Sequence, residues 1–274
     1  ESKDATIEKE LASAADNYAS VIAKCEAMDK MIADAMAGLG GRSIVLLTST
    51  VHSPSTLQII NEFLAKYPGS RHVQYDADSY SGMLLANEAS YGKRAIPSYR
   101  FDNAKVIVSL AADFLGTWLS PVEFTRQYAK GKKINEKNPA MSRHIHFEGA
   151  PSITGANADE KYLHRPSETG AVAVALLNAV NGQGASGISD AKLKAGIEKA
   201  AKELAANKGE ALVVCGSNDM NVQVVVNAIN EAILSGGKTI NWSSTYNTAQ
   251  GVDGEFAALV NDLSSGAIQA VMII

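Results

Sequence analysis

The sequence has few cysteines, few aromatic residues and no long apolar run. Its two cysteines, Cys25 and Cys215, are 190 positions apart (215 − 25), which excludes a disulfide framework and a Cys-rich iron–sulfur motif. No apolar segment reaches the ~20 residues that a membrane-spanning helix needs. The net charge of −4 and a pI near 5.8 give little support to a nucleic-acid-binding face. The chain therefore has the composition of an α/β protein that carries few cofactors.

Short apolar runs alternate with amphipathic segments along the 274 residues. Continuous apolar runs are typical of strands buried on both faces, and strand–helix alternation predicts mainly parallel sheets with crossover helices. We expect an α/β fold of two successive Rossmann-like units, residues 1–207 and 208–274, the second truncated at its C-terminus. The predicted strands are 43–48, 72–75, 105–110, 143–147, 210–215, 238–242 and 267–274; the predicted helices are 6–39, 55–66, 80–90, 120–130, 168–181, 190–207, 220–234 and 253–263.

The predicted N-terminal helix, residues 6–39, carries an apolar stripe whose spacings are sums of three and four. We expect this stripe to be buried, with Cys25 as a structural thiol. The closing run 267–274 resembles a buried strand that lacks the ligand-facing loop of doubly wound folds, so we expect a fragment of a longer protein. The stripe consists of Ile7, Leu11, Tyr18, Ile22, Cys25, Ile32, Met36 and Leu39.

Ligands of open α/β sheets bind beyond the carboxyl ends of the strands. The candidate loops are therefore residues 49–53, 111–117, 148–168 and 216–219, and none contains a dinucleotide fingerprint or a phosphate loop. The loop 216–219 could bind an anion, but Asp219 as a helix cap is the favoured interpretation.

Two histidines, His144 and His146, share one face of a predicted strand. With His164, Glu148 or Asp159 they could bind a metal ion, although hydrogen bonds to neighbouring backbone are the favoured alternative. The sequence has no Gly-x-Ser-x-Gly nucleophile elbow.

Residues 91–169 carry longer motifs, which include Tyr91-Gly-Lys-Arg-Ala-Ile-Pro, Ala112-Asp-Phe-Leu-Gly-Thr-Trp, Met141-Ser-Arg-His-Ile-His-Phe-Glu-Gly-Ala-Pro and His164-Arg-Pro-Ser-Glu-Thr. This stretch resembles the molybdopterin-oxidoreductase-like half of the large iron–sulfur subunit of bacterial alternative complex III. That assembly is a membrane-bound respiratory quinol:electron acceptor oxidoreductase, within the dimethyl-sulfoxide-reductase and polysulfide-reductase superfamily. The resemblance implies that the chain is a fragment of a larger molybdopterin-oxidoreductase-like fold.

The resemblance also implies that the molybdenum cofactor has been lost. Catalytic relatives contact the pterin dinucleotide with an Arg-Pro-Gly-Thr-Asp loop, where this chain has Arg165-Pro-Ser-Glu-Thr169. Ser167 restricts the backbone, and Glu168 adds negative charge where the pyrophosphate would lie. Another acidic residue stands in Ala111-Ala-Asp-Phe114, in place of Gly-x-Asn-Pro.

The leading hypothesis is a non-catalytic structural and docking domain on the periplasmic side of the bacterial inner membrane. Its partners would be the iron–sulfur-cluster region of the same polypeptide and other subunits of the complex. We expect no cofactor in this fragment, no nucleic acid and no membrane span of its own.

Two alternatives stay open. In the first, the chain is part of an active molybdopterin-dependent oxidoreductase that binds a bis-pterin guanine dinucleotide. The other is a small-molecule-binding module that uses the vestigial cofactor cleft. The candidate binding residues of that cleft are Thr154, Asn157, Asp159, Arg165, Ser167, Glu168, Thr169, Ser217 and Asn218. No catalytic or metal-ligating residue is assigned.

Overall fold

The computed structural model describes residues 3–40, 42–134, 136, 139–268 and 270–274. The chain forms two compact units. The first contains Glu1–Thr48, Ser53–Val73 and Ala258–Ile274, and the second contains Ser49–His52 and Gln74–Ala257. The boundary predicted between residues 207 and 208 lies inside the second unit, because spatial packing and the order of elements divide the chain differently.

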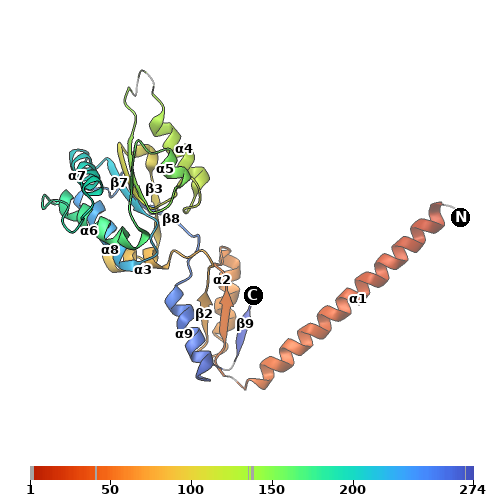
Figure 1. The fold of residues 1–274 in the computed structure, drawn as a ribbon. Helices are drawn as coiled ribbons and strands as arrows, with labels where there is room; N and C mark the ends of the chain where they lie inside the picture. Colours follow the sequence, from red (N-terminus) through yellow and green to blue (C-terminus); the bar gives the residue numbers. More distant parts are fainter. Residues whose placement is uncertain (1–2, 41, 135, 137–138, 269) are drawn as a thin grey trace. The chain divides into compact units, whose positions relative to one another are not determined.

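The first unit has a three-stranded sheet in the order β2-β1-β9, in which β1 and β9 are parallel (Figure 1). Ser53 caps α2, since its Oγ accepts a hydrogen bond from the Thr56 N–H. The closing strand was predicted to be buried, and this is wrong: β9 pairs with β1 on one side, and Ile273 is 75% exposed. The elements are α1 (Lys3–Gly38), β1 (Val45–Thr48), α2 (Pro54–Leu64), β2 (Arg71–Gln74), the later part of α9 (Asp253–Ser264) and β9 (Val271–Ile273).

The second unit is built on a four-stranded parallel sheet in the order β6-β5-β4-β7. The predicted α/β class, with mainly parallel sheets and crossover helices, is therefore confirmed. Its elements are α3 (Ser81–Tyr91), β3 (Ile96–Tyr99), η1 (Phe101–Asn103), β4 (Val106–Leu110), α4 (Pro121–Lys132), β5 (Arg143–Glu148), α5 (Ile153–Ala156), β6 (Glu160–Leu163), η2 (Pro166–Glu168), α6 (Thr169–Val180), α7 (Ala191–Ala206), β7 (Ala211–Cys215), α8 (Met220–Ala232) and β8 (Ile240–Tyr246).

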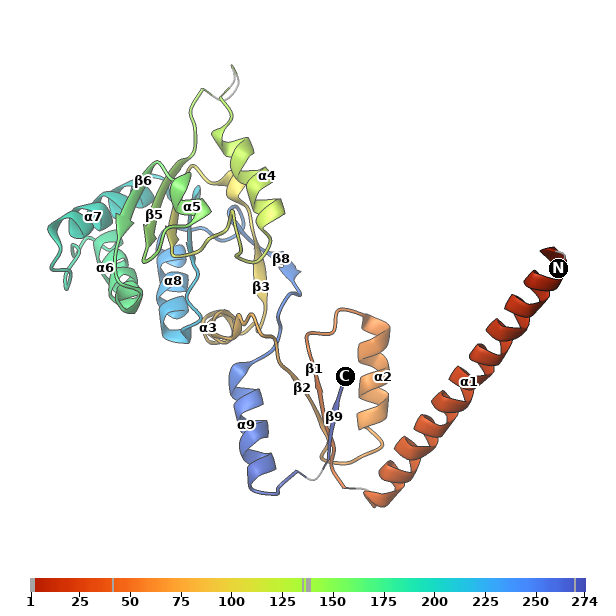
Figure 2. The ribbon, with the colours of Figure 1, turned by 45° about the vertical axis from the view of Figure 1, so that its right-hand side comes forward.

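Both faces of this sheet are covered (Figures 1 and 2). On one face, Val108 and Phe147 belong to a core formed with α6, α7 and α8. On the other, Ile107 and Val214 pack into an aromatic core with α3, α4 and the two-stranded antiparallel sheet of β3 and β8. Burial on both faces explains why β4 and β7 are continuous apolar runs. The aromatic core includes Tyr99, Phe101, Phe114, Trp118, Phe124 and Tyr128.

Among the strands and α-helices of the described residues, three short ones, β3, α5 and β6, are absent from the predicted set. The strand β3 contains Pro97 and pairs antiparallel with β8, with a register shift between Pro97 and Ser98. A proline is tolerated at such an edge or bulge. The elements α5 and β6 lie within residues 148–168, the third of the candidate ligand loops. Residues 131–139, a basic segment with glycine and asparagine whose composition predicts an exposed loop, lie partly outside the described residues.

The order in which strands are added to the sheet reverses at β4: β5 and β6 are added on one side of β4, and β7 is added on the other. A crevice for ligands is expected at such a point. Here backbone fills it: the Gly216 N–H donates to the Leu110 carbonyl at 2.9 Å. A Cβ on Gly216 would lie 2.3 Å from the Ala111 carbonyl oxygen. Ala111 itself has a φ of 54°, in the left-handed region that residues other than glycine rarely adopt.

We predict that Gly216→Ala lowers the free energy of unfolding by about 1–3 kcal/mol, because the added methyl group meets backbone rather than a movable side chain. Gly236→Ala is the matched control, since a Cβ there meets nothing within 4 Å. Urea denaturation of both variants measures the difference. Equal midpoints would contradict the tight contact.

Candidate ligand-binding site

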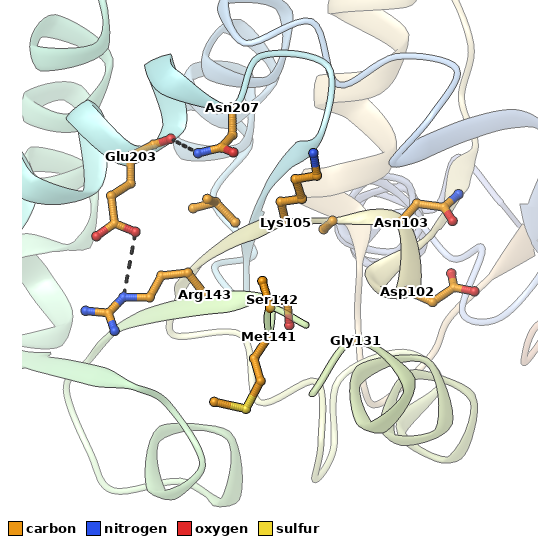
Figure 3. A pocket seen from close by; sticks show the side chains of 12 residues that line it. Asp102, Asn103, Lys105, Gly131, Met141, Ser142, Arg143, Glu203 and Asn207 are labelled. Carbon is orange, nitrogen blue, oxygen red and sulfur yellow. Dashed lines mark hydrogen bonds and ion pairs between the residues drawn. The ribbon is translucent and has the colours of Figure 1, made fainter. Parts of the chain in front are cut away.

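A hollow of about 510 Å³ lies at the amino ends of β4 and β5 (Figure 3). Its charged side chains are neutralised by ion pairs. Arg143 contacts Glu160 and, at 3.7 Å, Glu203, while Asp102 contacts Lys130 at 2.9 Å. Parallel sheets bind ligands at the opposite, carboxyl edge. We therefore place the candidate site at the carboxyl end of β5 and not here.

Strand β5 buries a row of polar side chains on one face. His144, His146 and Glu148 alternate with the apolar Ile145 and Phe147, which join the core on the opposite face. All five side chains are buried. A buried polar atom costs free energy unless it has a partner, so the surrounding loops must supply hydrogen bonds.

The Glu148 carboxylate is the centre of this polar group. Its Oε2 accepts a hydrogen bond from Ser152 Oγ at 2.7 Å and lies 3.1 Å from His146 Nε2. Its Oε1 lies 3.3 Å from Lys161 Nζ. A Cβ on Gly155 would lie 2.4 Å from the carboxylate, so a glycine is needed at this wall. The carboxylate thus holds the loop between β5 and α5 against the strand.

A cavity of about 250 Å³ opens beside this group, at the carboxyl end of the strand. Thr169 borders it, and its hydroxyl donates to the Pro166 carbonyl at 2.9 Å and lies 3.0 Å from His164 Nε2. This volume is below the roughly 300–1,000 Å³ of sites for drug-sized ligands, so only a molecule of a few heavy atoms would fit. The lining residues are Ala111, His146, Glu148, Gly149, Ala150, Ser152, Pro166 and Thr169.

The buried histidines are held neutral, and each keeps one acceptor nitrogen. Burial lowers the pKa of His144 to about 3 and also lowers the pKa values of His146 and His164. The Tyr128 hydroxyl donates to the Asn157 carbonyl, so it accepts from His144 Nδ1. Among the residues that the structure describes, His144 Nε2, His146 Nδ1 and His164 Nδ1 have no hydrogen-bond partner.

Serine, histidine and glutamate meet here, but not in the order of a catalytic triad. A triad needs the histidine between the serine and the carboxylate, with the carboxylate on the second ring nitrogen. Here Ser152 donates directly to Glu148, and both lie near the same nitrogen, His146 Nε2, at 3.4 and 3.1 Å. The Ser152 Oγ also accepts from the Gly155 N–H. This geometry is suited to binding rather than to nucleophilic attack.

Among the predicted site residues, Thr154 serves as a link between loops. Its Oγ1 donates to Asp113 Oδ1 at 2.7 Å and accepts from the Leu115 N–H at 2.9 Å. Asn157 and Asp159 border a separate hollow of about 430 Å³ between α4 and α5. The Asp159 carboxylate is already bound to Lys132 Nζ at 2.6 Å.

The other predicted residues lie in two turns. In η2, the Arg165 N–H donates to the Glu168 carboxylate at 2.9 Å, so Glu168 closes its own turn; Ser167 is exposed. After β7, the Ser217 Oγ accepts from the Asp219 N–H, and Asn218 Oδ1 accepts from the Gly82 N–H at 2.8 Å. Of the nine predicted residues, Thr169 alone lines the cavity beside Glu148.

Asp219 caps α8, as the sequence predicted, and accepts from the Asn221 and Val222 N–H groups. His144 and His146 do share a strand face, but their rings contact the side chains of Tyr128 and Glu148 rather than backbone. Within residues 3–40, 42–134, 136, 139–268 and 270–274, no group of three acidic, histidine or cysteine side chains could hold a metal ion.

Sequence reasoning left His146, Glu148 and Ser152 out of the predicted cleft, although His146 and Glu148 entered as metal candidates. A signal was present: polar residues at every second position of a strand that is otherwise apolar. Such a strand must bury its polar face against partners when both sides of the sheet are covered.

Comparison with known proteins finds similarity among solved structures. No family model matches the chain, and no curated protein matches it. Among solved structures, the chain is similar to the formyltransferase/hydrolase complex (FhcABCD) from Methylorubrum extorquens in complex with methylofuran, with 14% identity and a TM-score of 0.49. The match covers 90% of this chain and 57% of that one, so the chain spans less than two thirds of that relative.

These findings correct the family predicted from residues 91–169. The solved structure that the chain resembles is a formyltransferase/hydrolase complex, and neither a family model nor a curated protein supports a molybdopterin oxidoreductase or a subunit of alternative complex III. Membership of that family is therefore wrong, and the matching structure is not a respiratory iron–sulfur complex. The docking role predicted for the chain is tested by none of these comparisons and stays a prediction. A separate expectation holds: no helix in the described part of the chain has the length and apolar character to cross a membrane.

We predict that stability falls between pH 7 and pH 5 because of the buried histidines. An unfolded histidine has a pKa near 6.5, whereas His144 takes up its proton only near pH 3 when folded. The unfolded state therefore binds more protons in this window, and His144 alone costs about 2 kcal/mol at pH 5 relative to pH 7.

Urea denaturation at both pH values measures this loss. His144→Gln should remove about 2 kcal/mol of the pH dependence, since the side chain that replaces the imidazole does not titrate. If His144→Gln does not fold, a titration of the His144 imidazole by NMR serves instead. A ring that becomes protonated above pH 5 would refute the argument.

Proposed function

We propose that the chain is a small-molecule-binding domain whose ligand occupies the cavity at the carboxyl end of β5. One observation carries this proposal: His146 lines a cavity of about 250 Å³ while its Nδ1 has no partner in the described part of the structure. A buried acceptor of this kind favours a ligand that donates a hydrogen bond. Its position at the carboxyl edge of a parallel sheet also supports binding.

The chemistry of the lining defines the class of ligand. His146 is neutral at pH 7, and the Glu148 carboxylate is bound to Ser152 and paired with Lys161. The Thr169 hydroxyl and the Glu148 carboxylate add further acceptors. These groups favour a small molecule with hydroxyl or amino groups over a strongly charged anion.

This proposal retains one alternative from the sequence, the binding module, but moves its site. The docking role, the periplasmic location and the respiratory partners were implied by the resemblance alone, and they do not enter the proposal. The absence of a cofactor from the chain stays a prediction.

Filling the cavity is the test. We predict that Ala150→Leu abolishes binding of small polyols and amino alcohols, because Ala150 lines the cavity. Ala140→Leu is the matched control, since it makes the same change in the hollow at the amino ends of the strands. Saturation-transfer NMR with glycerol, ethanolamine and serine as probes measures binding to the full chain.

The His146 imidazole nitrogens, followed in the same samples, should shift when a probe binds to the wild-type chain and to Ala140→Leu. Two results would overturn the proposal. One is that no probe binds at millimolar concentration and that mass spectrometry of the natively purified chain finds no bound molecule. The other is that Ala140→Leu abolishes binding while Ala150→Leu does not.

A further inference from the structure

The helix α1 exposes its apolar residues. Leu11, Val21 and Ile32 are 64%, 56% and 51% exposed, and Cys25 is also exposed. The sequence analysis expected the apolar stripe to be buried, with Cys25 as a buried structural thiol. Within this chain that expectation is wrong, because Cys25 is exposed. A 36-residue helix with such a stripe needs a partner, because exposed apolar side chains of this number are unusual outside contact surfaces.

A second set of positions on α1, which overlaps the stripe and is here called the core positions, indicates what that partner is. Apolar or small residues recur with alternating spacings of four and three from Ile7 to Ala35, which is 28 residues, or four heptads. A strict seven-residue repeat differs from the 3.6-residue period of a helix packed on a globular core, and produces a left-handed coiled coil. The core positions are Ile7, Leu11, Ala14, Tyr18, Val21, Cys25, Met28, Ile32 and Ala35.

The opposite side of the helix is free of large apolar residues. The three outward positions of each heptad carry alanine, serine or a charged side chain throughout. A helix packed into the interior of a protein would be apolar on more than one side. The outward residues are Lys9, Ala12, Ser13, Asp16, Ala19, Ser20, Ala23, Glu26, Ala27, Lys30, Ala33, Asp34 and Ala37.

We propose that α1 pairs with α1 of a second copy of this chain as a parallel, in-register, two-stranded coiled coil. Charges beside the core determine partner and direction in such assemblies. In the parallel register, Lys24 lies opposite Asp29 of the other copy, and the pair occurs twice by symmetry. An antiparallel pair would instead bring Glu10 opposite Lys24, and the two directions place Cys25 differently: its two copies face each other only in the parallel pair.

Charge placed in the core tests the pairing. Val21→Glu with Ile32→Glu puts carboxylates at two core positions, and should raise the dimer dissociation constant roughly 100-fold or more. Ala23→Glu with Ala33→Glu adds the same charges at outward positions and should leave the dimer intact. Sedimentation equilibrium of the full chain measures the mass, and circular dichroism checks that the helix content is retained.

Cys25 reports direction and register without any substitution. It occupies a core position, so the two copies of Cys25 face each other in the proposed pair. Diamide should join them, each disulfide forming as two thiols lose two protons and two electrons to the diamide. Cys25→Ser should prevent the link, since the other cysteine, Cys215, is buried.

A dimer of the wild type and of the outward variant, a monomer of the core variant and a Cys25 link together support the proposal. A monomeric wild type at micromolar concentration would overturn it, and so would a dimer that survives both core substitutions. A dimer that gives no Cys25 link would overturn the parallel register. None of these results depends on the ligand site.

Discussion

Burial of the polar face of β5 is the constraint on which the second unit depends. Since both faces of the sheet are covered, His144, His146 and Glu148 are screened from water, and each unpaired polar atom costs about 1–3 kcal/mol. The loops at the carboxyl edge supply partners: Ser152 and Lys161 for Glu148, and Tyr128 for His144. The shape of these loops follows from that demand. The candidate cavity lies where, among the described residues, the set of partners is incomplete at His146.

Most of the fold could be predicted because burial on two faces leaves a strong mark on a strand. The continuous apolar runs of β4 and β7 and the periodic helices α6 to α8 follow directly from the sequence. The missed elements lack that mark. Pro97 argues against a strand, yet β3 accepts it beside a register shift. Strand β6, at the edge of the sheet, alternates half-buried and exposed residues over four positions, too few to distinguish it from a loop.

The site was harder to predict because its members come together only through tertiary structure. The spacing of His144 and His146 correctly placed them on one strand face, but spacing alone does not distinguish metal ligands from hydrogen-bonded side chains. The two roles are distinguished by contacts from segments outside the strand: Ser152 donates a hydrogen bond to Glu148, and Thr169 lines the cavity. The apolar residues of α1 show a related limit. Their spacing could be read from the sequence and indicates that one face of the helix is covered, but it does not identify the molecule that covers it.

The same distinction explains why a resemblance built on short motifs pointed to the wrong family. The turn at residues 165–169 satisfies its own hydrogen bonds, since Glu168 accepts from the Arg165 N–H and Thr169 donates to the Pro166 carbonyl. The loop at residues 216–219 likewise forms a helix cap. Residues engaged in closing a turn are selected by local geometry, so similar strings arise wherever such a turn is needed. A buried polar residue such as Glu148 carries more functional information, because its desolvation must be offset by groups that a ligand can also contact.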